Sequence, residues 1–189
     1  MSLLPASPRI APAEEPYDAS IADAFARIMP PGREPLNLFR TMARNPRVLQ
    51  RIFAGSLLDP GTLSLREREL VILRTCARCN SEYEWGVHVA FFGQRAGLSK
   101  EQIAATLPTA DNSDAWTDGE ALLIQLADQL HDSACISDML WEQLADNFTP
   151  EQLLELVALI GAYHTISYMT NAFRVALEPD AARFAAIAS

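Results

Sequence analysis

The sequence from Arg66 to Gly97 reads RERELVILRTCARCNSEYEWGVHVAFFGQRAG and is denser in reactive side chains than any other stretch of the chain. It holds two of the three cysteines, one of the three histidines and several acids. Apolar residues recur at helical spacing on both sides of Asn80 and Ser81, which predicts two helices joined by a short corner. This corner is therefore the expected place of a functional site.

The rest of the chain also carries helical patterns. Capping boxes, in which a hydroxyl residue precedes Glu or Gln by three positions, mark helix starts. They occur at Ser64–Glu67, Ser99–Gln102, Thr117–Glu120 and Thr149–Gln152. No segment shows the period-two alternation of a strand. The sequence therefore predicts an all-α fold, a bundle of helices.

The expected helices follow from apolar spacing and from Pro and Gly breaks. Their ranges are 21–29, 36–43, 46–57, 65–79, 80–92, 103–107, 122–130, 139–144 and 151–177. The last of these is apolar on most faces, as is typical of a helix central to the core or buried between subunits.

The domain organisation follows from composition. Prolines at positions 5, 8, 12 and 16 interrupt any periodicity, so residues 1–20 are expected to form an N-terminal arm, either disordered or laid over a neighbour. Residues 21–189 show no composition shift and only short loops, and a chain of 189 residues fits one domain. We expect one all-α domain after the arm.

Charge and hydropathy exclude two classes of partner. The net charge is −9 with scattered basic residues, so the basic patch of a nucleic-acid binder is missing. No apolar run approaches the roughly 20 residues that span a bilayer, and no membrane partner is expected. Prolines interrupt the first residues, unlike a signal peptide. The odd number of cysteines indicates reduced thiols, so we expect a cytoplasmic protein.

Cys76 and Cys79 have the C-x-x-C spacing of a dithiol couple or of half a metal site. They lie at the C-terminal end of the predicted helix, where the helix dipole disfavours a thiolate. The two cysteines can equally be small buried side chains. No second C-x-x-C and no histidine pair at zinc-finger spacing accompanies them, so we expect no metal site.

Glu84 and His88 are four residues apart, so their side chains meet on one helix face. A carboxylate beside an imidazole fixes its tautomer and raises its pKa, which suits acid–base chemistry. Glu69 shares a face with Ile72 and Leu73, so it either finds a donor, such as His88 or one of the arginines at 66 and 68, or lies at a cleft or at the exposed start of the helix. The alternative interpretation is structural: Ser81 and Glu84 also form a capping box, and His88 can be a core histidine.

Two other histidines can be explained by structural roles. His131 is expected at a helix end, where it interacts with the dipole. His164, with Tyr168 and Asn171 on neighbouring turns, either lines the same cavity as His88 or caps neighbouring helix ends. Arg74 and Arg78 either bind a substrate carboxylate or form surface ion pairs.

The segments RERELVILR, YEW-x-x-H and AGLS together resemble the carboxymuconolactone decarboxylase family, which includes alkylhydroperoxidase D-like proteins. The resemblance spans roughly residues 45–107 and, more loosely, 161–172. It implies an all-α, homo-oligomeric protein, a dimer, trimer or hexamer, with a site near a subunit boundary.

In the peroxidase branch of this family, a histidine follows a C-x-x-C pair by four residues and a glutamate lies one helix earlier. Aligned on His88, the cysteine positions are occupied by Ser81 and Glu84, and Glu69 matches the relay glutamate. The Cys76/Cys79 pair is offset by five residues. The YEW branch is therefore more similar to the decarboxylase side.

The resemblance and the residues together predict a carboxymuconolactone decarboxylase-like enzyme, a lyase ahead of a peroxidase. Glu69, Glu84 and His88 are its expected catalytic residues, acting by proton transfer on a small carboxylated or lactone substrate. Ser81, Tyr83 and Trp85 are expected to line the pocket. No cofactor is expected.

Two alternatives stay open. One is a thiol-dependent peroxidase or disulfide reductase that uses Cys76 and Cys79, with an antioxidant role. The other is a non-catalytic, oligomeric helical module that binds a small ligand.

Overall fold

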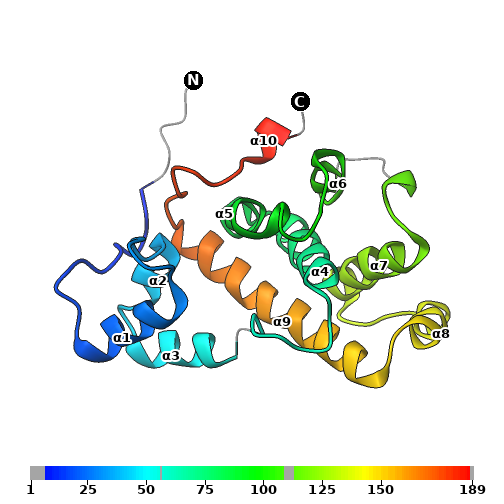
Figure 1. The fold of residues 1–189 in the computed structure, drawn as a ribbon, viewed down its shortest axis with the longest axis horizontal. Helices are drawn as coiled ribbons and strands as arrows, with labels where there is room; N and C mark the ends of the chain where they lie inside the picture. Colours follow the sequence, from blue (N-terminus) through cyan, green and yellow to red (C-terminus); the bar gives the residue numbers. More distant parts are fainter. Residues whose placement is uncertain (1–6, 56, 109–112, 188–189) are drawn as a thin grey trace.

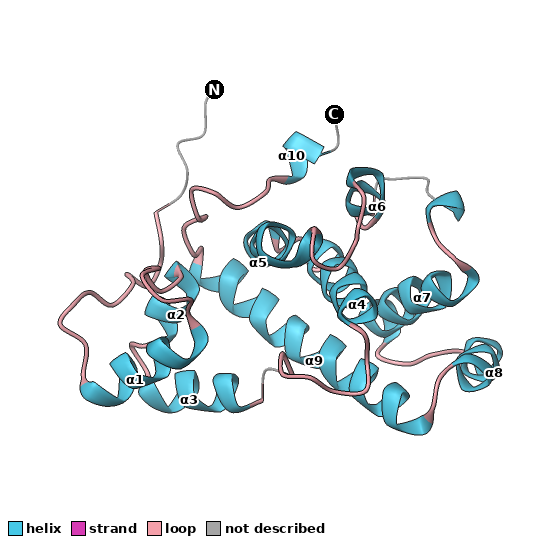
Figure 2. Ribbon diagram, in the orientation of Figure 1, coloured by secondary structure: helices cyan, strands magenta, loops and turns pink. Residues whose placement is uncertain are grey.

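The computed structural model describes residues 7–55, 57–108 and 113–187. Within these ranges it consists of helices and loops and contains no strand (Figure 2). The predicted all-α fold is confirmed.

The N-terminal part contains three short helices, α1 (Ala19–Ile28), α2 (Asn37–Met42) and α3 (Pro46–Ala54). Asn45 caps α3 by accepting a hydrogen bond from the Val48 N–H, and Pro46 takes the first helical position. Before α1, the arm lies along α2 and the end of α9: the Arg9 N–H donates to the Phe173 carbonyl. The division into arm and single domain stays a prediction.

The reactive corner joins α4 (Leu65–Arg78) to α5 (Glu82–His88). Asn80 turns the chain with a positive φ of 51°, a conformation that Asn tolerates better than most residues. A one-turn π-helix, Val89–Gly93, continues α5 directly, and α6 (Lys100–Ala105) follows. The two predicted helices and their corner are confirmed.

The C-terminal half contains α7 (Asp118–Ser133), α8 (Asp138–Asn147), α9 (Pro150–Phe173) and α10 (Phe184–Ile187), with a short 3₁₀ turn at Ser113–Ala115. All four predicted capping boxes are present, at the starts of α4, α6, α7 and α9. The last long helix was expected to reach Leu177 but ends at Phe173, because Arg174 adopts a left-handed conformation.

α9 crosses the middle of the molecule, with α1, α2 and α3 gathered around one end and α4, α5 and α7 around the rest (Figure 1). α4 packs most extensively against α7 and α9. The large core joins α4 and α7–α9 and includes Leu73, Leu126 and Leu156, all fully buried. A second cluster, the N-terminal core, joins α1–α3 to one face of α5 through Tyr83 and Val87.

By length and composition, α9 could cross a membrane, a test that the core helix of a soluble protein also passes. Its side chains Leu156, Leu159, Ile160 and Tyr163 are buried in this fold. The helix therefore has the position of the central helix in a soluble-type bundle.

Candidate functional site

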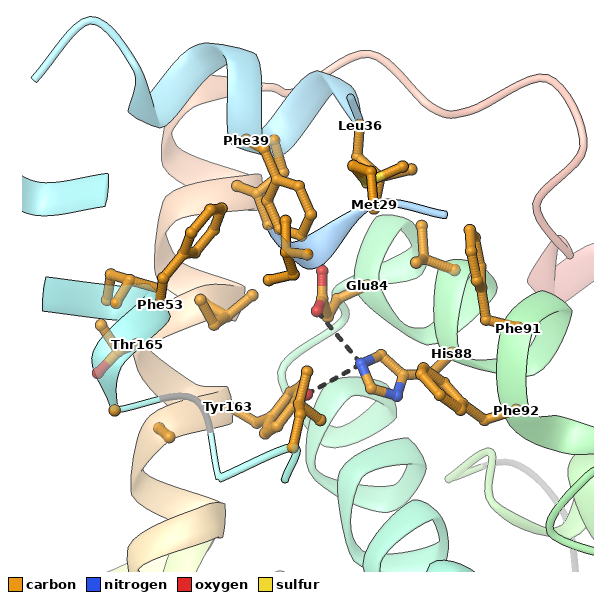
Figure 3. A pocket seen from close by; sticks show the side chains of 18 of the residues that line it. Met29, Leu36, Phe39, Phe53, Glu84, His88, Phe91, Phe92, Tyr163 and Thr165 are labelled. Carbon is orange, nitrogen blue, oxygen red and sulfur yellow. Dashed lines mark hydrogen bonds and ion pairs between the residues drawn. The ribbon is translucent and has the colours of Figure 1, made fainter. Parts of the chain in front are cut away.

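A cavity of about 450 Å³ lies where the N-terminal core meets the large core. Figure 3 shows its lining, which is mostly apolar and aromatic. The lining includes Met29, Phe39, Phe53, Phe91 and Phe92. A cavity of this size with a few convergent polar groups is typical of a small-molecule site.

Glu84 and His88 both lie in the cavity lining, as does Tyr163 of α9 (Figure 3). The His88 Nε2 atom is 2.9 Å from the Tyr163 hydroxyl and 3.5 Å from Glu84 Oε1. The other ring nitrogen, Nδ1, is 2.6 Å from Glu69 Oε2. Because Glu69 accepts the Nδ1 proton, the orientation of the ring is fixed and Nε2 is turned toward the cavity.

Glu69 is fully buried, and its second oxygen accepts a hydrogen bond from Arg68 Nε at 3.2 Å. It therefore makes both of the contacts that its position in the sequence allowed, one to an arginine and one to His88. Glu69 does not line the cavity itself. The structure brings Glu69, Glu84 and His88 into one contact network.

Burial and the neighbouring carboxylates have opposite effects on the pKa of His88. Burial lowers the pKa of His88, but the carboxylates of Glu69 and Glu84 outweigh it and raise the pKa to about 9. The imidazole is therefore protonated at neutral pH. Burial, followed by the same two carboxylates, raises the pKa of Tyr163 well above its ordinary value, so its hydroxyl stays neutral.

Ser81 does not form the capping box with Glu84 that the sequence also allowed. The Ser81 side chain makes no capping bond at α5; its Oγ lies 2.8 Å from Thr170 Oγ1 of α9, and both groups are buried. Ser81 therefore joins α5 to α9 and does not line the cavity. Glu84 is left to face His88.

Tyr83 and Trp85 do not line the cavity either, so the expected pocket lining needs correction. The Tyr83 hydroxyl donates to Glu178 Oε1 at 2.5 Å and accepts from the Leu38 N–H. The Trp85 indole N–H donates to Thr106 at 2.9 Å. Neighbours of Glu84 in the sequence point to other faces of α5, because successive helical residues are about 100° apart.

Cys76 and Cys79 are free thiols. Cys76 is fully buried; burial, followed by the negative charge of Glu84, raises its pKa well above the ordinary value. Burial also raises the pKa of Cys79. Neither cysteine lines the cavity. The microenvironment therefore disfavours the thiolate that redox chemistry requires.

The arginines at the cavity differ from those singled out in the sequence. Arg74 forms a bidentate ion pair with Asp128, and Arg78 contacts Asp128 and Asp132. Arg51 and Arg95 line the cavity instead, and both are exposed. Within the described parts of the chain, neither forms an ion pair with a carboxylate.

The π-helix at Val89–Gly93 begins directly after His88. It widens the helix by one residue per turn where Phe91, Phe92 and Arg95 enter the lining of the cavity. The Arg95 guanidinium lies 5.4 Å from the centre of the Phe92 ring. Single-turn π-helices are frequent at functional sites, and no periodicity in the sequence indicated this one.

Comparison with known proteins identifies one family and several similar folds. Residues 45–128 match the family model of the carboxymuconolactone decarboxylase family. A comparison with curated protein sequences gives no match.

Three solved structures illustrate the fold similarity. A peroxidase-related protein from Silicibacter sp. TM1040 has a TM-score of 0.78 and 16% identity over 95% of this chain and 97% of its own. A peroxidase-related protein from Ralstonia eutropha JMP134, described as an alkylhydroperoxidase AhpD core, has a TM-score of 0.73 and 19% identity, covering 93% of this chain and 95% of its own. The debrominase Bmp8 has a TM-score of 0.68 and 14% identity over 90% and 92%. At these identities the similarity establishes the fold.

Proposed function

Because residues 45–128 match the model of the carboxymuconolactone decarboxylase family, we propose that the chain is a member of this family and an acid–base enzyme acting on a small carboxylated or lactone substrate. One observation carries this proposal: His88 Nε2, oriented by Glu69 at Nδ1, faces Glu84 and Tyr163 in the lining of an apolar cavity. A positioned imidazole with a raised pKa is a general acid ready at neutral pH.

The proposed reaction is a decarboxylation. The bond between the carboxylate carbon and the substrate breaks, CO2 leaves, and the electron pair stays on the substrate as an enolate conjugated with the lactone carbonyl. The His88 Nε2–H then donates its proton to the enolate carbon, so a C–H bond forms and an N–H bond breaks. Glu84 and the Tyr163 hydroxyl lie within reach of Nε2 and would return a proton from solvent to His88.

The residues that line the cavity fit a substrate with an apolar body and a negative charge. Aromatic and aliphatic side chains form most of its lining, while Arg51 and Arg95 are exposed lining residues that form no ion pair with any described carboxylate. A guanidinium binds a carboxylate through two parallel hydrogen bonds. We propose that one of these arginines holds a substrate carboxylate.

The test is turnover of a panel of small carboxylated lactones in deuterated water, with CO2 release and deuterium uptake followed together. The wild type is expected to incorporate one deuteron for each CO2 released. Glu84→Gln is expected to lower kcat by about 10²-fold or more, since it removes a proton carrier. One of the two variants Arg95→Gln and Arg51→Gln should act mainly on KM, and Arg47→Gln, an exposed arginine outside the cavity, serves as the control.

Two results would reject this function. One is a wild type that releases no CO2 from any member of the panel. The other is peroxide reduction by the wild type that is lost in Cys76→Ser, which would favour the thiol alternative.

We also propose that the protein is a cytoplasmic homo-oligomer. Leu154 and Val157 of α9 are exposed, large apolar side chains on one face of the central helix, and the neighbouring Gly161 has open space around its Cα. Such a stripe on a helix can be buried against a second copy of the chain.

Sedimentation equilibrium is expected to give a mass of at least two times 20.8 kDa, in a whole-number ratio to the chain mass. Val157→Glu should shift the mass toward the monomer, since it places a charge in the apolar stripe, whereas Glu142→Gln on the exposed face of α8 should not. A monomeric wild type would contradict the proposal.

A further inference from the structure

Outside the cavity, three potential metal ligands meet where the ends of α4 and α7 contact the middle of α9. They are Cys79, the residue that caps α4, His131 in the last turn of α7, and His164 of α9. One ligand atom from each lies within 4.8 Å of both others. All three side chains are partly exposed, so an ion from solvent can reach them.

Two separations between the ligand atoms are close to those around a single tetrahedral ion. His131 Nδ1 is 3.1 Å from His164 Nε2 and 3.7 Å from Cys79 Sγ. Bonds of about 2.1 Å to nitrogen and about 2.3 Å to sulfur place neighbouring ligands of a zinc ion roughly 3.2–3.8 Å apart. The third pair, Cys79 and His164, has ligand atoms within 4.8 Å of each other, so binding of one ion requires the side chains to rotate toward a common centre.

One ligand, His164, is already oriented by a hydrogen bond outside the cluster, and a second, Cys79, is anchored through its backbone. The His164 Nδ1–H donates to the Ile160 carbonyl at 2.9 Å, which leaves Nε2 as the ring nitrogen that faces His131. Asn171 Nδ2 donates to the Cys79 carbonyl at 2.8 Å, which ties the end of α4 to α9. Metal-binding histidines usually donate their second ring N–H to a carbonyl or carboxylate oxygen, as His164 does here.

The charges around the cluster come from α4 and α7. Arg78 and the carboxylates of Asp128 and Asp132 lie beside it, and Arg78 is held by both carboxylates. The arginine charge is therefore largely compensated.

We propose that Cys79, His131 and His164 form a binding site for one divalent zinc-class ion, with a fourth position open to water or to an external ligand. A sulfur and two imidazole nitrogens are a donor set that suits Zn²⁺. On binding, the Cys79 thiol releases its proton to solvent, and His131 shifts its proton from Nδ1 to Nε2. The bound ion would join the ends of α4 and α7 to α9. This inference is independent of the proposed reaction, because none of its ligands lines the cavity.

The experiment is calorimetric titration of the metal-free full-length protein with ZnCl2, in a phosphine reductant and in two buffers of different ionisation enthalpy. We expect one Zn²⁺ per chain and release of about one proton per ion, since the thiol must ionise. Cys79→Ser, His131→Gln and His164→Gln should each weaken binding by at least ~100-fold. Cys135→Ser, which removes an exposed thiol outside the cluster, is the matched control and should bind as the wild type does.

A second measurement does not depend on the variants. Co²⁺ bound to the wild type is expected to show a thiolate-to-cobalt charge-transfer absorption, with the d–d intensity of a tetrahedral site. The proposal is overturned if Zn²⁺ does not bind at one per chain, if the absorption is absent, or if Cys135→Ser removes binding while Cys79→Ser and His164→Gln retain it.

Discussion

His88→Gln is expected to lower kcat of the proposed decarboxylation by about 10²- to 10⁴-fold, the usual contribution of a positioned acid–base group. Glutamine keeps a side chain of similar length, but it cannot give up a proton to an enolate. The variant also leaves Glu69 and Glu84 without the cation between them. Removing one partner of a buried ion pair typically costs about 3–5 kcal/mol, so urea unfolding should show a parallel loss of stability.

A second variant separates the loss of chemistry from the loss of stability. Tyr163→Phe removes only the hydroxyl that lies 2.9 Å from His88 Nε2 and keeps the ring in the core. Its kcat should fall by about 10-fold with a stability close to wild type, whereas Tyr168→Phe on the exposed face of α9 should change neither. Full turnover in His88→Gln would contradict the assigned role of His88.

Glu69→Gln is expected to have the second largest effect, because it acts on the pKa of His88. An amide oxygen can still accept the Nδ1 proton, so the orientation of the ring is retained. The negative charge is lost, while burial continues to oppose the imidazolium. The pKa of His88 should therefore fall from about 9 to its ordinary value or below. Titration of the His88 ring signals by NMR measures this directly.

The same change should move the pH dependence of activity. With protonated His88 as the acid, kcat of the wild type falls only as the pH rises through about 9. In Glu69→Gln the fall should come near or below neutral pH. Glu142→Gln, an exposed carboxylate on α8, should leave the profile unchanged. An unshifted profile would show that Glu69 does not tune His88.

Stability should follow the protonation of His88 as well. The pKa of His88 is raised from 6.5 to about 9 in the folded state. The contribution of the protonated ring to the free energy of unfolding is therefore fully present below about pH 6.5 and is lost as the pH rises through about 9. At roughly 1.4 kcal/mol per pKa unit, the shift corresponds to about 3 kcal/mol. In Glu69→Gln this loss between pH 6.5 and 9 should largely disappear.

Local sequence signals were sufficient for most of the secondary structure. Each of the four capping boxes predicted from the sequence starts a helix, because a hydroxyl and an acid or amide three residues apart satisfy backbone donors without tertiary help. The box at Ser81 and Glu84 shows the limit of this reasoning. There, Thr170 competes for the Ser81 hydroxyl from a helix 89 residues away.

The candidate site was partly predictable for the same reason. Glu84 and His88 meet because four residues make about one helical turn, and this contact follows from spacing alone. Tyr163, Arg51 and Arg95 carry no local signal, since they reach the cavity from α9, α3 and the segment after the π-helix. The expected lining by Tyr83 and Trp85 needed correction because adjacent residues of one helix face different neighbours.

The sequence by itself determined the all-α fold, the helix starts, the corner between α4 and α5, and the pairing of Glu84 with His88. All of these depend on interactions within a few residues along the chain. Only the tertiary structure decided that Glu69 binds His88 Nδ1, that Tyr163 meets Nε2, and that Cys79 meets two distant histidines instead of acting with Cys76. These contacts depend on how α4, α5, α7 and α9 pack against one another. The spacing of residues within the stretch 66–97 does not determine that packing.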